Sequence, residues 1–361
     1  MSVVRPDAAA WTGTGAGRSV VTLTPAPAVD RTYAVASLRP GVVNRAASVT
    51  ETLGGNGVNV TRALLAHGAA SHAVVPLAPD VLAGLDDAER AGLRPVDLGV
   101  RTRVNTVVTT HDGTTTNVNE VPAPLTRTQW TALTVAALRT TLETDARWLV
   151  VTGCLPARAD NGDHRADRDR RADGDRRADG DLVDVLPLVL AARTIGLSVA
   201  FDVPGHQLTA VLDPLAPVDL VKPNVDELAQ AVGHPLASVD DVVRAARTLL
   251  ARGARRALVT MGEAGALLVD PHGHTVVPGI AAACVDTTGA GDAALAGYLA
   301  ADVDGVAPAV AARRAVRWGS AAVAQRGATL RATPATRASR PAPHRPDTAD
   351  RLRGDALVAI G

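Results

Sequence analysis

The sequence predicts an α/β fold in which a mostly parallel central sheet is flanked by helices. Hydrophobic residues make up 47% of the 361 positions, enough for a large core, and aromatic residues only 2%, so Ala, Val and Leu must fill it. Short Val-rich runs alternate with helical patterns of ten or more residues, and parallel strands require such crossovers. Glycine-rich turns precede several of the helical patterns and are typical of strand-to-helix connections.

The expected elements follow this alternation along the chain. A β-rich run at 19–24 comes first, and further strands are expected near 73–77, 104–110, 148–152, 197–202, 219–222, 256–260, 265–269 and 274–278. Helices are expected over 57–67, 81–91, 128–141, 182–195, 239–252, 289–302 and 307–325.

Residues 19–330 are predicted to form one domain. Two Val- and Thr-rich segments within it, 31–53 and 101–121, break the alternation and are expected to form a small β lid over one edge. The segment 160–181 is a low-complexity insertion with RRADGD in tandem, and it is too polar to offset its ordering entropy. Residues 1–18 are expected to be a disordered N-terminus and 331–361 a mostly disordered tail.

Composition excludes several classes of function. Lys+Arg and Asp+Glu balance at 37 each, so no whole-molecule field attracts nucleic acid or anionic membrane. The single lysine, Lys222, precedes Pro223, so no Walker A loop is present. Cys154 and Cys284 form no Cys-x-x-Cys pair, which argues against a disulfide scaffold or a structural zinc site. With neither a signal pattern nor a long apolar run, a cytoplasmic protein is expected.

The sharpest motif is DTTGAGD at 286–292, directly before an apolar helical run. Glycines at a helix start let the backbone approach a ligand, and the free N–H groups and helix dipole favour an anion there. The same geometry is expected to keep Asp292 ionised, as a base in phosphoryl transfer requires. The alternative is a glycine-rich turn whose Asp caps the helix.

Three further motifs accompany it. GGNGVN at 54–59 also leads into a helix, and its alternative interpretation is a tight strand-to-helix turn. Asn224 and Glu227 lie one helical turn apart after a strand, which suits hydrated Mg²⁺ near nucleotide phosphates, or else a capping box. The stretch 259–265 is a turn between strands that is open to backbone contact.

These four motifs, in this order, resemble the PfkB (ribokinase-like) family of carbohydrate kinases. The N-terminal stretches TLTPAPAVDRTY and RTRVN and the later NE–P–P stretch resemble its 1-phosphofructokinase and tagatose-6-phosphate kinase branch. The resemblance implies a ribokinase-like three-layer sandwich, and transfer of the γ-phosphoryl group of ATP, with Mg²⁺, to a hydroxyl of a sugar phosphate. The expected acceptor is fructose 1-phosphate. The resemblance also implies a homodimer formed through the lid.

The resemblance also assigns roles to residues. Asp292 matches the catalytic base, and the anion hole matches Gly289, Ala290 and Gly291. The nucleotide and Mg²⁺ side matches Asn224, Glu227, Thr260, Gly262 and Gly265, with no direct protein ligand to the metal. The substrate side matches Asp30, Gly54, Gly55, Asn56, Gly57, Asn59 and Arg103, the last reaching the substrate phosphate.

Three departures from the family pattern lie on the sugar-phosphate side. Ala26 stands where the family has Asn, Asn56 where it has Lys, and Cys154 follows Gly153 where it has Ser. A lost charge-assisted contact costs roughly 1.5–3 kcal/mol, and Arg45, Arg62, Arg101 and Arg158 are candidates to compensate. Two alternatives therefore stay open: a kinase of the same fold for another acceptor (another sugar, tagatose 6-phosphate or a nucleoside), and a catalytically weak sensor of sugar phosphate or nucleotide.

Overall fold

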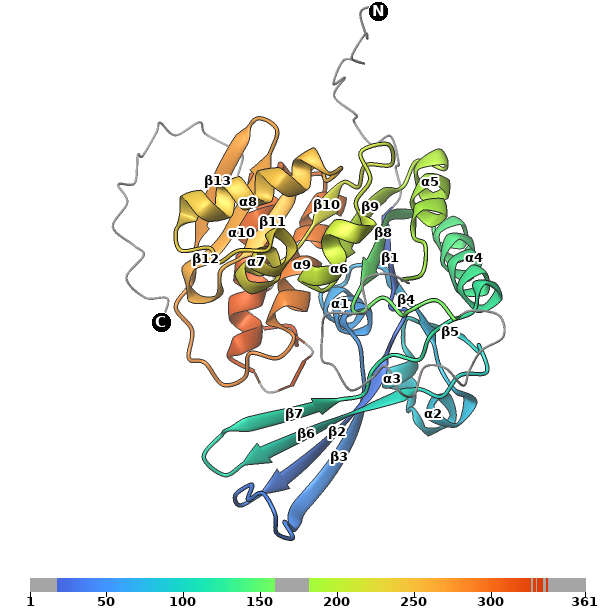
Figure 1. Ribbon diagram of the computed structural model, residues 1–361, viewed down its shortest axis with the longest axis vertical. Coiled ribbons are helices and arrows are strands. Elements are labelled where there is room, and N and C mark those ends of the chain that lie inside the picture. Colours follow the sequence, from blue (N-terminus) through green and yellow to red (C-terminus); the bar gives the residue numbers. More distant parts are fainter. Residues whose placement is uncertain (1–17, 160–181, 326, 329, 334–335, 337–361) are drawn as a thin grey trace, which may run out of the picture.

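The computed structural model describes residues 18–159, 182–325, 327–328, 330–333 and 336 (Figure 1). The predictions for residues 1–17, for the insertion at 160–181 and for most of the tail lie outside the described residues. Of the predicted tail, residues 331–333 and 336 are described, and the carbonyl of Thr336 accepts a hydrogen bond from Trp318 Nε1 at 3.3 Å.

Within the described residues, nine strands form the main sheet in the order β13-β12-β11-β10-β9-β8-β1-β4-β5. Their bounds are β1 (Ser19–Leu23), β4 (Ser71–Pro76), β5 (Leu93–Val96), β8 (Ala146–Thr152), β9 (Ser198–Asp202), β10 (Leu220–Val221), β11 (Ala257–Thr260), β12 (Gly265–Asp270) and β13 (Gly273–Pro278). Pairing is parallel from β5 through to β11, and the β11–β12 and β12–β13 pairs are antiparallel. The predicted, mostly parallel sheet is confirmed.

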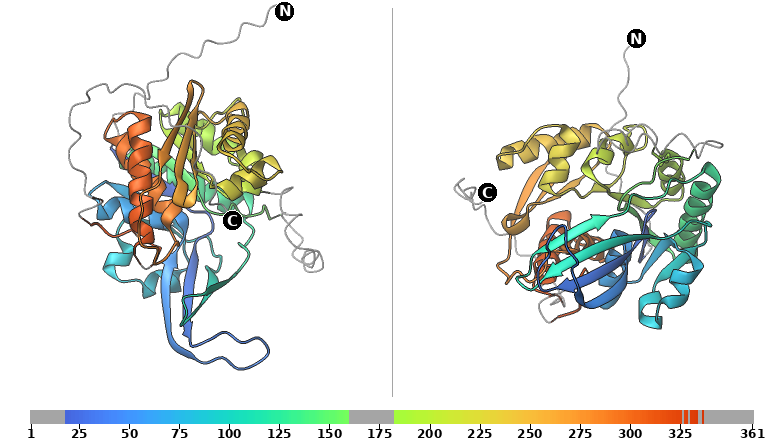
Figure 2. Two further views of the ribbon diagram at one scale, coloured as in Figure 1. Left: turned by 90° about the vertical axis from the view of Figure 1, so that its left-hand side faces the viewer. Right: turned by 60° about the horizontal axis from the view of Figure 1, so that its bottom comes forward.

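Helices cover both faces of this sheet. One face carries α1 (Asn56–Ala66), α9 (Ala290–Val303) and α10 (Pro308–Val323); the other carries α4 (Arg127–Glu143), α5 (Leu186–Thr194), α6 (Gly205–Val211), α7 (Val225–Val232) and α8 (Val239–Ala251). In the left view of Figure 2, the red helices lie on one side of the orange strands and the yellow helices on the other.

Alternation along the strands explains the two apolar layers. Successive side chains of a strand point to opposite faces. Val20 and Trp148 accordingly pack with α1, α9 and α10, whereas their neighbours Val21 and Leu149 pack with α4 and α5. Because both faces are covered, the strands are apolar at nearly every position. This arrangement gives the predicted three layers.

The helix expected over 81–91 is instead two short helices, α2 (Pro79–Gly84) and α3 (Asp87–Arg90). Asp86 is the reason, because its carboxylate accepts from Glu89 N at 2.8 Å while Glu89 accepts from Asp86 N at 3.1 Å. This capping box starts a new helix where the periodic pattern suggested continuity. Strand β5 and helix α6 are additional elements that the apolar pattern did not indicate.

A second sheet of four strands projects from one end of the main body (Figure 1). It consists of β2 (Ala28–Val35), β3 (Ala46–Gly54), β6 (Arg103–Thr110) and β7 (Thr115–Asn119), in the order β3-β2-β6-β7. The segments predicted as extra strands therefore form the small β sheet that was expected, and this sheet is called the lid below.

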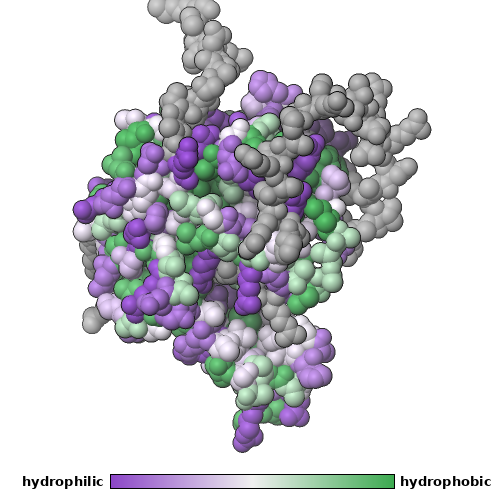
Figure 3. Space-filling model, turned by 180° about the vertical axis from the view of Figure 1, so that it is seen from behind, coloured by the Kyte–Doolittle hydropathy of each residue, from purple (hydrophilic) through white to green (hydrophobic). Residues whose placement is uncertain are grey.

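The surface seen from behind mixes hydrophilic and hydrophobic side chains (Figure 3). Among the helices of the described residues, none is both long and apolar enough to span a bilayer.

Candidate active site

The topology of the main sheet places a crevice at the carboxyl ends of β1 and β8. From β1 the chain continues to β4 and β5 on one side, whereas β8, β9 and β10 follow on the other. The first crossover, through α1, covers one face, and the crossover through α5 covers the opposite face. Loops diverge at such a switch point, and open parallel sheets bind their ligands there. The start of α1 lies at this crevice, because a Cβ on Gly57 would lie 2.3 Å from Thr24 Oγ1 and 3.0 Å from Thr152 Cγ2.

Asn59 and Asp292 meet at its centre. Asp292 lies in the first turn of α9, Asn59 lies in the first turns of α1, and both are more than 90% buried. The side-chain amide of Asn59 donates to Asp292 Oδ2 at 2.8 Å. Two glycine-led helix starts, predicted separately from the sequence, thus converge on one carboxylate.

Asp292 does not titrate as the sequence predicts. Burial, and secondly the charge of Asp202, raise its pKa to about 7, against the opposing effects of Asn59 and Lys222. The prediction that the helix start favours the ionised carboxylate is therefore wrong in direction, because the pKa of Asp292 is raised. Loss of solvation at a fully buried position outweighs the helix dipole, which stabilises an anion by only about 1 kcal/mol.

Beside Asp292 lies a buried ion pair that the sequence analysis missed. Lys222 Nζ is 3.0 Å from Asp202 Oδ1, both side chains are 5% exposed, and Thr152 Oγ1 donates to Asp202 Oδ2 at 3.3 Å. Burial lowers the pKa of Lys222, but the charges of Asp202, Glu227 and Asp292 exceed that effect and raise it. The available signal was that the single lysine of the chain directly follows a buried strand.

The first turn of α9 faces this lysine. A Cβ on Gly291 would lie 3.3 Å from Lys222 Nζ, so the backbone of the turn passes close to the ammonium group. Gly289 caps the helix at φ 75°, and a Cβ there would lie 2.0 Å from the carbonyl oxygen of Ala328. Only glycine fits that position. The N–H groups of a first helical turn and a buried ammonium group together favour an anion.

Asn224 and Glu227 form the capping box that the sequence left as an alternative. Asn224 Oδ1 accepts from Glu227 N at 2.8 Å, and Glu227 Oε2 accepts from Asn224 N at 2.8 Å. The cap also fixes the Glu227 carboxylate near Lys222 and Asp202. Burial chiefly raises the pKa of Glu227, Asp202 raises it further, and Lys222 lowers it. Asn224 and Glu227 are therefore a helix cap, and Glu227 is also one of the acidic groups around Lys222.

The residues predicted for the nucleotide side lie at the adjoining strand ends. Thr260 forms a bridge with Asn224, and its N–H donates to Pro223 O at 3.0 Å. Gly262 has φ 56° and open space around its Cα. Gly265 differs, because a Cβ there would lie 2.1 Å from the carbonyl oxygen of Val277. Glycine is therefore required at position 265 by the close approach of β13, whereas Gly262 leaves room for a ligand.

Asp30 lies where the lid joins the main body. Asn105 Nδ2 donates to Asp30 Oδ1 at 2.9 Å, and a Cβ on Gly54 would lie 2.0 Å from Asp30 Oδ2. Glycine at 54 therefore makes room for this carboxylate. Burial raises the pKa of Asp30, while Asn105 and Arg103 oppose the rise. Asn105 is a second polar residue that sequence reasoning did not identify.

The other glycines of this turn press α1 against β1. A Cβ on Gly57 would lie 2.3 Å from Thr24 Oγ1, and Thr22 Oγ1 donates to Gly57 O at 2.9 Å. Gly55 caps the helix at φ 133°. Asn56 points toward the turn after β8, with its Oδ1 3.6 Å from where a Cβ on Gly153 would lie. Close packing, as in the alternative of a tight turn, accounts for Gly57.

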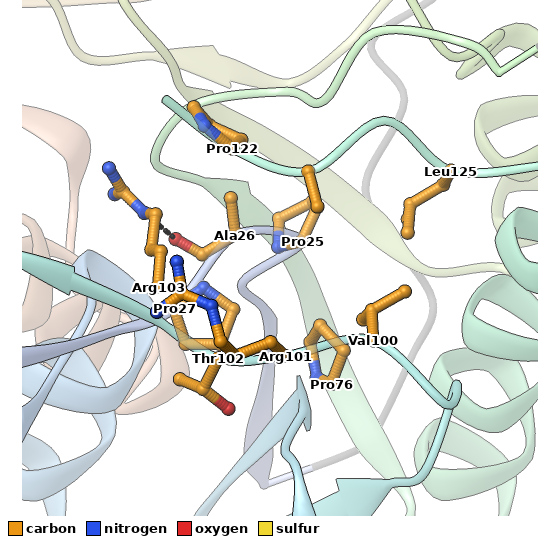
Figure 4. A pocket seen from close by; sticks show the side chains of 11 residues that line it. Pro25, Ala26, Pro27, Pro76, Val100, Arg101, Thr102, Arg103, Pro122 and Leu125 are labelled. Atoms are coloured by element: carbon orange, nitrogen blue, oxygen red, sulfur yellow. Dashed lines mark hydrogen bonds between the residues drawn. The ribbon is translucent and has the colours of Figure 1, made fainter. Parts of the chain in front are cut away.

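Arg103 lies at the start of β6, beside a small pocket at the base of the lid (Figure 4). Its Nη1 donates to Glu120 O at 2.8 Å and its Nε donates to Ala26 O at 3.3 Å, the contact drawn dashed in the figure. The charge of Arg103 also acts on Cys154, whose pKa burial raises and Arg103 lowers. Arg103 thus lies near Ala26 and Cys154, which are two of the three positions that depart from the family pattern.

In the described part of the chain, no group of three or more His, Cys, Asp or Glu side chains is arranged to hold a metal ion. Glu227 offers a carboxylate at the start of α7, where its Oε2 accepts from Asn224 N at 2.8 Å. Carboxylate oxygens such as these suit Mg²⁺ that keeps several waters.

Comparison with known proteins agrees with this geometry. A family model described as pfkB family carbohydrate kinase matches residues 190–335. The 1-phosphofructokinase of Haloferax volcanii is 33% identical over 313 residues, which cover 85% of this chain and 92% of that protein. The 1-phosphofructokinase of Rhodobacter capsulatus is 31% identical over 317 residues, covering 84% and 90%.

The crystal structure of phosphofructokinase-2 from Escherichia coli in complex with potassium superposes with a TM-score of 0.74 at 26% identity, covering 88% of this chain and 96% of that one. The likeness therefore covers most of this chain and nearly all of that one. Since it extends over almost the whole length of these relatives, the chain belongs to the PfkB family of carbohydrate kinases.

Proposed function

We propose that this sugar-phosphate kinase is a 1-phosphofructokinase, which converts fructose 1-phosphate and ATP to fructose 1,6-bisphosphate and ADP. One observation carries the proposal: Asp292, with a pKa of about 7, lies between the helix start that suits an anion and the Asn59 side of the crevice. The relatives named 1-phosphofructokinase support the choice of acceptor.

Asp292 acts as the general base. A base works best when its pKa lies near the working pH, and burial brings Asp292 there. Asn59 holds Oδ2, which leaves Oδ1 to take the proton from the C6 hydroxyl as that oxygen attacks the γ-phosphorus. Negative charge on the transferring group is stabilised by the N–H groups at the start of α9, from Gly289 to Gly291, and by Lys222, which lies beside Gly291.

The nucleotide binds on the side of Thr260, Gly262 and Gly265, with Asn224 at the adjoining strand end. Glu227, fixed by the cap with Asn224, would help to hold hydrated Mg²⁺ next to the phosphates. When bound, Mg²⁺ neutralises part of the phosphate charge.

The sugar phosphate binds between the lid and the main body. Asp30, steadied by Asn105 and given room by Gly54, accepts sugar hydroxyls, with Gly55, Asn56 and Gly57 along the same turn. Arg103 binds the phosphate. Its hydrogen bonds in the structure go to neutral carbonyl oxygens, which orient the guanidinium group and keep its positive charge for the phosphate. A homodimer through the lid and a cytoplasmic location remain predictions.

A neutral acceptor is the second candidate, and Asn56 favours it. Its amide faces Gly153 without bringing a charge to the turn where family members have lysine. We expect Asn56→Lys to lower the KM for fructose 1-phosphate if the turn faces a phosphate. An unchanged or higher KM would favour an unphosphorylated sugar or a nucleoside.

An ADP-release assay tests the proposal. The full chain with MgATP is offered fructose 1-phosphate, tagatose 6-phosphate, fructose 6-phosphate, fructose, ribose and adenosine in turn. Turnover with fructose 1-phosphate well above the others supports the proposal. Turnover confined to an unphosphorylated acceptor refutes it, and binding without any turnover supports the sensor alternative.

A further inference from the structure

Glu120, just beyond the end of β7, contacts the segment that leads into β6. Its carboxylate oxygen Oε2 accepts from Val104 N at 2.9 Å and from Arg101 Nη2 at 2.6 Å. Its own carbonyl accepts from Arg103 Nη1 at 2.8 Å. One residue therefore contacts both arginines of the RTR sequence and the backbone of β6.

Glu120 contacts the two arginines through different groups, its carboxylate and its backbone carbonyl. Arg101 forms an ion pair with the carboxylate of Glu120 at 2.6 Å. Arg103 is held through Nη1 and Nε by two carbonyl oxygens, those of Glu120 and Ala26, which orient the guanidinium plane without cancelling its charge. A planar cation fixed in this way is prepared to bind a phosphate.

The segment on which Arg103 lies is anchored from the other side as well. Thr102 is 7% exposed, and its Oγ1 accepts from Ala78 N at 3.1 Å. The hydrogen bond from Val104 N to Glu120 Oε2 anchors the same segment from the lid side. It is also the bond that lowers the pKa of Glu120 most, with Arg101 second.

We propose that Glu120 is a positioning residue for the phosphate of the sugar substrate. Its carboxylate ties the segment after β7 to Val104 and pairs with Arg101, so that its carbonyl holds Arg103 in the orientation that binds phosphate. This inference rests on the proposed function, because it takes Arg103 to be the phosphate contact.

Kinetics of side-chain variants test it in the full chain. Glu120→Ala removes the tie to Val104, and we expect the KM for fructose 1-phosphate to rise about tenfold, the effect of one charge-assisted contact. The kcat and the KM for ATP stay unchanged. Glu120→Gln keeps an oxygen that can accept from Val104 N, so most of the affinity returns. Glu51→Ala is the matched control, because it removes the other lid ion pair, with Arg31, away from Arg103.

A double-mutant cycle separates positioning from a general loss of structure. In an Arg103→Gln background, Glu120→Ala should add no further rise in KM, since the residue that it positions is gone. An unchanged KM in Glu120→Ala, or an equal loss in both backgrounds, overturns the proposal. A rise in the KM for ATP of the same size also overturns it.

Direct binding keeps this inference distinct from the proposed function. Calorimetric titration of fructose 1-phosphate measures its affinity whether or not turnover occurs. If the unmodified protein binds fructose 1-phosphate but does not phosphorylate it, the proposed function fails, and a weaker affinity of Glu120→Ala still supports the positioning role. If the unmodified protein does not bind this sugar phosphate at all, both fail.

Discussion

The side-chain amide of Asn59 lies 2.8 Å from a carboxylate oxygen of Asp292, although 233 positions separate the two residues in the chain. The contact joins the first turns of α1 and α9, which pack side by side on one face of the sheet. It forms only when the N-terminal and C-terminal parts of the core are assembled. The proposed base is thus oriented by a residue from the substrate side of the crevice.

Asp292→Asn removes the proposed base and keeps nearly the same shape. We expect kcat to fall by about 10²–10⁴, the range that general-base catalysis contributes, while ATP still binds. Steady-state kinetics and calorimetric titration with MgATP measure the two effects.

Asp304→Asn is the matched control, because this residue lies just past the end of the same helix with its side chain 58% exposed. Turnover should survive in this variant. Equal activity of Asp292→Asn and the unmodified protein would remove the base assignment.

The pH dependence of activity should follow the pKa of Asp292. A base with its pKa raised to about 7 is protonated and inactive below that value, so kcat/KM should rise with pH up to about 7 and then level off. Phosphate monoesters themselves titrate near about 6, so the values are corrected for the fraction of substrate dianion. A corrected profile that is flat between about pH 5 and 8 would contradict the pKa derived from burial.

Gly54→Ala tests the space that Asp30 occupies. The new Cβ would lie 2.0 Å from Asp30 Oδ2, so the carboxylate must move away from its place beside Asn105. We expect the KM for the sugar phosphate to rise about tenfold or more, with little change in the KM for ATP. Gly84→Ala, where a Cβ meets nothing within 4 Å, serves as the control. If Gly54→Ala and Gly84→Ala had the same KM for the sugar phosphate, Asp30 would not contact the sugar.

Substitutions of Lys222 and Asp202 should have non-additive effects on the free energy of unfolding. Lys222→Met leaves a buried carboxylate without its partner, and such a loss costs about 3–5 kcal/mol of unfolding free energy. Adding Asp202→Asn removes the uncompensated charge and should restore part of that loss, as denaturant unfolding can measure. Additive losses in the double variant would show that the two charges do not interact.

Lys222→Met should also shift the activity profile. Lys222 lowers the pKa of Asp292, so its removal moves the rising limb of kcat/KM to higher pH. A purely structural role for Lys222 would leave the position of that limb unchanged.

The local features of the fold were predictable because they are encoded over short stretches. Alternation of apolar runs with helical patterns indicated the three layers, and the glycines before α1 and α9 indicated where backbone turns sharply into a helix. Gly289 is a clear case, since its left-handed conformation and the nearby Ala328 carbonyl admit no side chain. The break between α2 and α3 was missed because the Asp86 cap competes with an apolar period that continues through it.

The sequence by itself determined where the glycine-led helix starts occur along the chain and which of their residues are candidates for the site. Only the tertiary structure decided how they interact: Asn59 against Asp292, Lys222 against Asp202, Asn105 against Asp30, and Glu120 against two arginines. It also decided the titration of Asp292, which the helix start alone predicted in the wrong direction. The physical reason is that glycine conformations and caps depend on neighbours in sequence. Burial and charge–charge distances depend instead on which distant segments pack together.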